Sequence, residues 1–245
     1  MKLFYDLHLH SCLSPCGDDL MTPANIAGMG KIVGLSVMAL TDHNTAKNCP
    51  AFFKACEAYG ITPIAGMELS TAEDVHLVCL FPTLEAALAF DEALESHRMP
   101  IENAPDIYGH QWVMNENDEV TEEMKPLLIA ATDLFMGDAV DLVRGFGGVI
   151  YPAHIDRDSS GIIAMLGDIP PEYAFSAVEY RDLANREHYE ALYGEARGKR
   201  VVVSSDAHRL EDINEAVNAY ELALPENASH GEIRAAVLKF LQDLS

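Results

Sequence analysis

The chain has 245 residues, of which 49% are hydrophobic, and 39 acidic against 16 basic residues give it a formal net charge of −23. The length suits one α/β barrel or two small domains, and the composition is that of a globular protein rather than a disordered one. The acidic balance repels polyanions at long range and so disfavours long nucleic acids as partners. No segment approaches the roughly 18 apolar residues of a membrane span, and no apolar leader precedes the first expected strand. We therefore expect no membrane partner and a cytoplasmic location.

The five cysteines do not predict a disulfide framework, because their number is odd and the chain is not small. Cys12 and Cys16 form a single C-x3-C pair. A zinc knuckle needs a second pair at similar spacing, which this sequence lacks.

Short apolar segments alternate with helical patterns along the chain. Thr22 and Pro23 have the residue types of a helix N-cap and first helical position, and Ser229 is a second candidate cap. Strands are expected at 3–7, 36–40, 61–65, 75–81, 149–152, 177–180, 201–205 and 219–224. Helices are expected at 23–33, 46–59, 83–96, 126–146 with a break near Gly137, 159–166, 185–197 and 229–243. This alternation predicts an α/β fold with a parallel sheet or barrel.

The stretch from His97 to Lys125 departs from this pattern. It is polar, contains Pro100 and Pro105, and has weak periodicity. We expect residues 1–245 to form a single domain in which this stretch, about 97–125, is a lid or small insertion. A packing appendage is the alternative.

Polar motifs follow four of the expected strands. They are DLHLHS at 6–11, TDHN at 41–44, GME at 66–68 and SSDAH at 204–208. Single histidines stand at the start of another strand, His76, and after a further one, His154. Side chains two apart on a strand share a face, so His8 and His10 can bind one ion.

Six of the ten histidines therefore lie in or beside apolar strands. A lone histidine near a strand is more often a structural residue than a ligand, but six interleaved with Asp and Glu favour a metal centre. The carboxyl ends of parallel barrel strands converge on one face, where such residues would meet. Imidazole and carboxylate without thiolate suit Mn, Zn or Fe.

The motifs H-x-H-S, T-D-H, G-x-E, A-H and S-D-A-H, in this order, resemble the polymerase and histidinol phosphatase (PHP) family over residues 4 to about 215. The resemblance implies a distorted (β/α)7 TIM-like barrel with a trinuclear metal centre of Mn, Zn or Fe. It is closest to the stand-alone phosphoesterase branch, since the sequence carries no polymerase module.

The resemblance also implies nine metal ligands: His8, His10, Asp18, His43, Glu68, His76, His154, Asp206 and His208. The first ion would be bound by His8, His10, Glu68 and Asp206. Glu68 would bridge to a second ion, held also by His76 and His154. The third ion would be bound by His43 and His208. Glu68, Asp206 and His208 are the expected catalytic residues.

The remaining ligand of the third ion is ambiguous. Many relatives supply an Asp from the loop after H-x-H, where this sequence has Pro15. Counting back from Thr22 places Asp18 at the ligand position, with Asp19 as the alternative.

The expected charges suit a phosphate substrate. Three divalent ions and three carboxylates would leave about +3 at the centre, and a metal-bound hydroxide would be the nucleophile. Arg157, Arg181 and Arg209 each follow a motif or strand end and are candidate phosphate ligands, although surface ion pairs are the alternative. Asp42 either orients a ligand histidine or caps the next turn.

Hydrolysis of small phosphorylated metabolites or nucleotides is thus the favoured function. A nuclease acting on short oligonucleotides is the first alternative. A catalytically silent metal-binding interaction module would predict eroded ligands, and hydrolysis of C–N bonds fits the S-D-A-H motif less well. The oligomeric state stays open.

Overall fold

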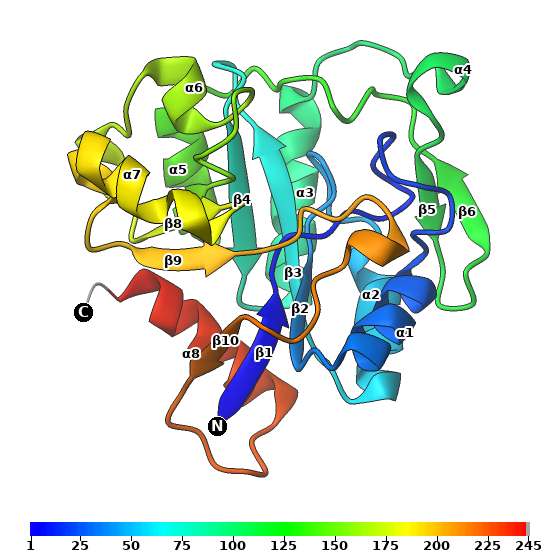
Figure 1. The fold of residues 1–245 in the computed structure, drawn as a ribbon. Coiled ribbons are helices and arrows are strands. Elements are labelled where there is room, and N and C mark those ends of the chain that lie inside the picture. The colour runs from blue at the N-terminus through cyan, green and yellow to red at the C-terminus, as the bar shows by residue number, and fades with distance from the viewer. Residues whose placement is uncertain (244–245) are drawn as a thin grey trace.

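The computed structural model describes residues 1–243, which form ten strands, eight α-helices and five short 3-10 helices (Figure 1). The strands are β1 (Lys2–Asp6), β2 (Val37–Leu40), β3 (Thr62–Ser70), β4 (His76–Phe81), β5 (Trp112–Met114), β6 (Val120–Glu123), β7 (Val149–Pro152), β8 (Ala177–Tyr180), β9 (Arg200–Val203) and β10 (Ala219–Glu221). The α-helices are α1 (Pro23–Val33), α2 (Cys49–Tyr59), α3 (Leu84–Leu94), α4 (Pro105–Tyr108), α5 (Met136–Gly145), α6 (Ile162–Leu166), α7 (Arg186–Leu192) and α8 (His230–Gln242). The 3-10 helices are Glu95–His97, Pro171–Tyr173, Leu183–Asn185, Gly194–Ala196 and Leu210–Asp212.

The main sheet is curled and has the strand order β10-β1-β2-β3-β4-β7, while β8 and β9 form a separate parallel pair (Figure 1). Backbone hydrogen bonds just beyond the strand ends link this pair to both sides of the main sheet. Ile155 N donates to Glu179 O (2.9 Å), and Asp206 N donates to His8 O (3.0 Å). The predicted α/β fold of the distorted-barrel type is therefore confirmed.

Two strands run against the expected direction, since β10 is antiparallel to β1 and β4 is reversed as well. The prediction was a parallel sheet, but β4 is antiparallel to both β3 and β7. The reason is local: β3 extends to Ser70 and returns through a short turn, so that Ser70 faces His76. Because β4 is reversed, its first residue, His76, lies at the edge where the neighbouring strands end.

The core has two parts, one on each face of the curled sheet. Inside the curl, apolar residues of the strands meet Ile233, Val237 and Leu241 of α8, which closes one end of the barrel. Ser229 caps this helix in a full capping box, as its sequence predicts. Outside the curl, helices α1, α2, α3 and α5 cover the strands (Figure 1).

The predicted helix over 126–146 is wrong in its first half, because residues 126–135 are irregular. Their carbonyl groups accept from other parts of the chain: Asn44 Nδ2 donates to both Leu128 O and Ala130 O. Helix α5 begins only at Met136, whose N–H donates to the Glu73 carboxylate. The predicted helix 185–197 is also too long, since α7 ends at Leu192.

The polar stretch contains α4 and the hairpin β5–β6, and it packs against the loop that follows β1. Leu13 of that loop forms a small separate core with Val113, Met124 and Leu128. Gly109 lies so close to the Pro15 carbonyl oxygen that a Cβ would collide with it, and its φ of 99° favours glycine. These contacts hold the stretch against the loop, while its description as a lid or small insertion, the alternative of a packing appendage, and the single-domain description of the chain all stay predictions.

Among the described residues, no helix is long and apolar enough to cross a membrane. All five cysteines lie in the described part of the chain, and all are free.

Candidate metal centre

Eight of the nine expected ligands lie together at one mouth of the barrel, and Glu68 is at their centre. Its carboxylate oxygens lie within 3.4 Å of a nitrogen of five histidines: His8, His10, His43, His76 and His154. Glu68 is 1% exposed, so these contacts are shielded from water. A second carboxylate, Asp206, lies 3.2 Å from His10 Nε2 and 3.5 Å from His8 Nε2. The eighth residue, His208, stacks on His10 with ring centroids 4.3 Å apart.

The first two histidines present unprotonated nitrogens to one point when they are neutral. His8 Nδ1 donates to Glu179 Oε1 (2.9 Å), and His10 Nδ1 is bonded to Ser14 Oγ (3.0 Å), so the Nε2 atoms face inward. These two Nε2 atoms are 3.2 Å apart. Two nitrogens bound to one tetrahedral Zn²⁺ at about 2.0–2.1 Å would be separated by about 3.3 Å. The pair therefore has the spacing that a shared cation requires.

The side chains form three groups whose ligand atoms lie within 4.8 Å of one another. The groups are His8, His10, Glu68 and Asp206; His43, Glu68 and His76; and His10, His43 and His208. The first is the set expected for the first ion. The second group differs from the set expected for the second ion, because it contains His43 in place of His154, which contacts Glu68 but belongs to no group. The third group contains the expected His43 and His208, and His10 in addition.

Two further observations fit a divalent cation here. His43 Nδ1 is buried and has no hydrogen-bond partner among the described residues, although it lies 3.1 Å from Glu68 Oε2. A buried nitrogen without a partner is costly unless something else binds it. His154 and Asp206 adopt the left-handed region, with φ of 30° and 53°. Such strain is concentrated at functional sites.

The electrostatics of the cluster favour positive charge at its centre. Burial lowers the pKa of His10, but hydrogen bonds and attraction from Asp206 and Glu68 outweigh it and raise the pKa to about 9. Burial raises the pKa of Asp206, yet the neighbouring His8 and His10 bring it well below its usual range. The outer His208 behaves oppositely, since burial and the charge of His10 lower its pKa to about 4. Protons thus collect where cations would bind, as expected of ligands that exchange protons for metal.

Sequence reasoning missed Glu179. It lies in β8, is 1% exposed, and accepts from both His8 Nδ1 and the His154 backbone N–H (3.2 Å). A carboxylate that binds the far nitrogen of a metal-ligating histidine fixes its tautomer and orientation. The sequence feature that could have identified Glu179 is that a carboxylate interrupts an otherwise apolar strand.

Among the described residues, the Asp42 carboxylate makes no hydrogen bond with the ring of His43 or with the following turn. Its carboxylate accepts from Ser11 N, Ser11 Oγ and Ser14 Oγ, each at 2.7 Å. Of the two roles considered for Asp42, the geometry matches orientation of a histidine, but the histidine is His10, reached through Ser14.

Two predicted site residues are not brought to the cluster. The Asp18 carboxylate accepts from Leu20 N in an exposed turn, and Asp18 belongs to none of the three groups, although its N–H bonds to His208 O. The next residue, Asp19, is also exposed. Arg209 is exposed and lines neither of the two cavities beside the cluster that the structure describes. Cys16, by contrast, lines one of them, although it is exposed.

Two cavities open beside the cluster. One, of about 330 Å³, is lined by Arg157, Arg181, Asp206 and His208 among others. The second, of about 300 Å³, is lined by Arg157 together with Glu68, His43 and His76. Arg157 Nη1 also pairs with Asp206 Oδ2 at 2.8 Å, so one predicted phosphate ligand already contacts the cluster.

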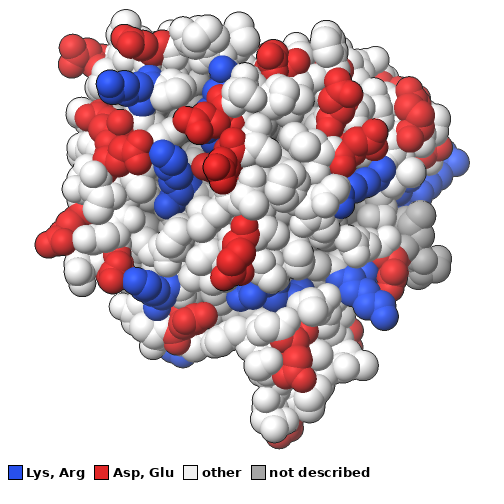
Figure 2. Space-filling model, turned by 180° about the vertical axis from the view of Figure 1, so that it is seen from behind, with Lys and Arg blue, Asp and Glu red and all other residues white. Residues whose placement is uncertain are grey.

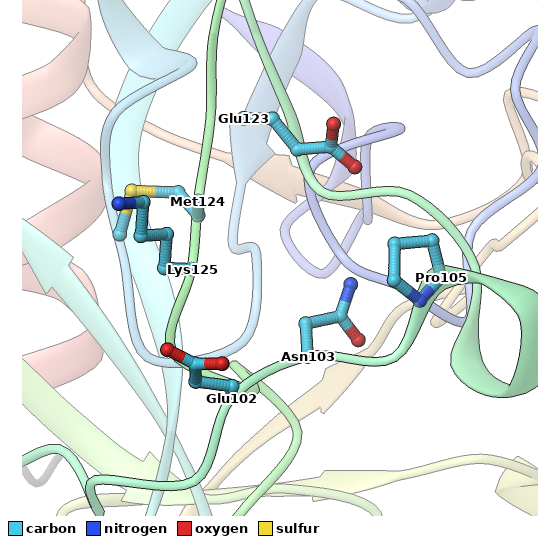
Figure 3. Close-up of a pocket in the computed structure, with 6 residues that line it drawn as sticks. All are labelled: Glu102, Asn103, Pro105, Glu123, Met124 and Lys125. Carbon is cyan, nitrogen blue, oxygen red and sulfur yellow. The ribbon is translucent and has the colours of Figure 1, made fainter.

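A larger pocket of about 450 Å³ lies in the polar stretch, away from the histidine cluster. Figure 3 shows it between the arms carrying Glu102 to Pro105 and Glu123 to Lys125. It shares no lining residue with the cluster, so cavity size alone does not locate the site.

Comparison with known proteins gives a family-model match over part of the chain and a partial relative. Residues 6–119 match the model of the PHP domain. A 5'-3' exoribonuclease of Haemophilus influenzae is 32% identical over 102 residues, which cover 38% of this chain and 36% of that protein. The match thus spans little more than a third of the exoribonuclease.

Solved structures share the fold at low sequence identity. The lesion-specific Endonuclease Q of Pyrococcus furiosus is 19% identical with a TM-score of 0.69, over 98% of this chain and 56% of that one. Endonuclease Q has also been solved with a 27-mer duplex carrying an abasic lesion at the active site. A protein of Bifidobacterium adolescentis, provisionally described as a metal-dependent phosphoesterase, is 17% identical with a TM-score of 0.56, over 83% and 87% of the two chains.

The family match begins at Asp6, immediately before the H-x-H motif, and contains Glu68 at the centre of the histidine cluster. The match covers residues 6–119, under half of the chain, and the fold of the whole chain agrees with that of the solved structures, so the chain is similar to the PHP domain family.

Proposed function

We propose that this PHP-family metal-dependent hydrolase cleaves phosphate esters of small metabolites or nucleotides. The observation that carries the proposal is the buried Glu68 carboxylate within 3.4 Å of five histidine nitrogens, beside cavities lined by arginine. No purely structural role explains so many imidazoles directed at one carboxylate.

The residues proposed to hold three divalent ions are those carried over from the family, with Asp18 as the weakest member because its carboxylate faces another way. Imidazole and carboxylate donors suit Mn, Zn or Fe. Such ions activate water and stabilise negative charge on phosphoryl oxygens. Within this proposal Glu68 bridges two ions, and Asp206 and His208 complete the catalytic set.

Arginine supplies the proposed phosphate ligands. Arg157 and Arg181 line the same cavity, beside Asp206 and His208. Guanidinium groups bind phosphate oxygens in pairs. Arg157 contacts Asp206 directly, so a substrate phosphate held there would lie next to the proposed ions.

The charge of the chain favours small substrates. A small phosphoester brings one or two negative charges to a molecule with a net charge of −23. A long nucleic acid would need many Lys and Arg to replace its counterions. On the face in Figure 2, basic side chains are interspersed with acidic ones and form no continuous track.

A nuclease is the second candidate, and specific comparisons favour it. The partial relative is an exoribonuclease, and Endonuclease Q acts on a DNA duplex. These names speak against excluding nucleic acid entirely. Short oligonucleotides fit both this chain's charge and those relatives. Turnover of no substrate at all would instead indicate a silent interaction module.

The deciding experiment compares a nucleoside monophosphate and bisphosphate with oligonucleotides of increasing length, at fixed ionic strength, using metal-stripped protein to which Mn²⁺ is added. We expect kcat/KM to be highest for the smallest phosphates and to fall with length. Arg181→Ala should raise KM more for a terminal phosphate than for an internal diester. Arg186→Ala, in an exposed ion pair with Glu190, is the matched control. If kcat/KM instead rises steadily with oligonucleotide length, the small-molecule proposal is wrong and the nuclease takes its place.

A further inference from the structure

We propose that Asn48 and the hairpin β5–β6 hold His10 in its metal-binding tautomer through a chain of hydrogen bonds that includes Ser11, Asp42 and Ser14. This inference rests on the proposed metal centre. It makes Asn48 a positioning residue and assigns the polar stretch a role in the site.

The proton order at Ser14 follows from its partners. Ser14 Oγ lies 2.7 Å from Asp42 Oδ1, 3.1 Å from His43 N and 3.0 Å from His10 Nδ1. The His43 N–H can only donate, and an ionised carboxylate can only accept. The single hydroxyl proton must therefore go to Asp42, because otherwise two oxygen acceptors would face each other at 2.7 Å. Ser14 Oγ then accepts from His10 Nδ1–H, and the His10 Nε2 lone pair is left facing the cluster.

The same reasoning continues to Asn48. Ser11 Oγ donates to Asp42 Oδ2 (2.7 Å) and accepts from Asn48 Nδ2 (2.9 Å). The orientation of the Asn48 amide is determined by the hairpin. Its Nδ2 also donates to Trp112 O (3.0 Å), and its Oδ1 accepts from Met114 N (2.7 Å).

Each link in this chain is satisfied and buried. Ser11, Ser14, Asp42 and Asn48 are at most 1% exposed. A fully satisfied buried network has one arrangement, whereas a partly broken one has several. The hairpin is itself anchored beside the loop, since Trp112 N donates to Cys12 O (3.2 Å) and Asp118 accepts from Thr22 Oγ1 (2.5 Å).

Asn48 also forgoes a common local role. It occupies the N-cap position of α2, where Asn usually accepts a bond from the helix, but its side chain makes no capping hydrogen bond. Its amide is used entirely by Ser11 and the hairpin. The Asn48 side chain thus serves the network and not the helix.

The test is Asn48→Asp, which keeps the shape but replaces the Nδ2 donor by an acceptor facing Ser11 Oγ and Trp112 O. Two readouts are compared with wild type: the hydrogen-bonded Nδ1–H resonance of His10 in ¹⁵N-histidine-labelled, metal-free protein, and the affinity for Zn²⁺ alone by chelator competition. We expect the resonance to shift or be lost to solvent exchange, and the Zn²⁺ Kd to rise about 10- to 100-fold, as for loss of other groups that orient metal ligands.

Thr83→Ala is the matched control, because Thr83 caps α3 through Ala86 N and lies outside the network. It should lower the Tm without changing either readout. If Asn48→Asp does not fold, Ser11→Ala cuts the same chain with a smaller change and should give the same two shifts. An unchanged His10 resonance with a Kd within twofold of wild type would overturn the proposal, as would an equal loss of Zn²⁺ affinity in Thr83→Ala. The resonance needs neither ions nor turnover, so failure of the proposed phosphoesterase activity would leave this result readable.

Discussion

Replacing Glu68 by Gln tests the centre of the proposed site most directly. The change preserves shape but removes one negative charge and places an amide NH₂ among five imidazoles. Glu68 is 1% exposed, so water cannot substitute for the lost carboxylate. Breaking a buried ion pair by removing one partner costs about 3–5 kcal/mol. We therefore expect bound metal to be lost and, for a similar loss in the transition state, kcat to fall on the order of 10²- to 10⁴-fold.

The assay pairs initial rates with Mn²⁺ on p-nitrophenyl phosphate and bis(p-nitrophenyl) phosphate with metal content by elemental analysis. Glu57→Gln, on the exposed face of α2, is the matched control and should resemble wild type. A Glu68→Gln variant that kept a tenth of wild-type kcat would refute the reasoning. Such a loss corresponds to only about 1.4 kcal/mol, too little for a carboxylate that bridges two ions.

Three further predictions concern the loop, the metal-free state and the sheet. Within the proposed three-ion centre, Asp18→Asn should weaken the third site more than Asp19→Asn does, measured as ions bound per chain by elemental analysis, and loss in Asp19→Asn instead would exchange the two residues. Burial lowers the pKa of His10, but hydrogen bonds and attraction from Asp206 and Glu68 outweigh it and bring the pKa to about 9, above the usual value near 6.5, so its protonation stabilises the metal-free protein below pH 6.5. The contribution of His10 protonation to the free energy of unfolding, at most about 3 kcal/mol, should be lost as the pH rises from 6.5 to 9. Denaturant unfolding curves should show no such loss when metal is bound. Gly66→Ala should destabilise the fold by about 1–3 kcal/mol, because the new Cβ would lie 2.5 Å from the backbone oxygen of Cys79. A Tm equal to that of wild type would contradict this close contact.

Much of the site could be read from the sequence because it follows strand ends. The H-x-H spacing predicts that His8 and His10 face one point, and their Nε2 atoms lie 3.2 Å apart. The apolar segments before Asp42, Glu68 and Asp206 indicate strands that carry these residues to a common edge. These inferences depend only on local periodicity, which residue types determine largely by themselves.

Other features depend on contacts between distant segments, and only the tertiary structure decided them. The reversed direction of β4 brings His76 to the edge where the other strands end, although the sequence marks it as the start of a strand. Glu179 contacts His8 across 171 positions of the chain, and Asn48 joins Ser11 to a hairpin more than sixty residues away. Residues 126–135 have helical periodicity but give their backbone groups to Asn44 and Ser70. Local preference is worth a fraction of a kcal/mol per residue, so buried hydrogen bonds to distant partners override it.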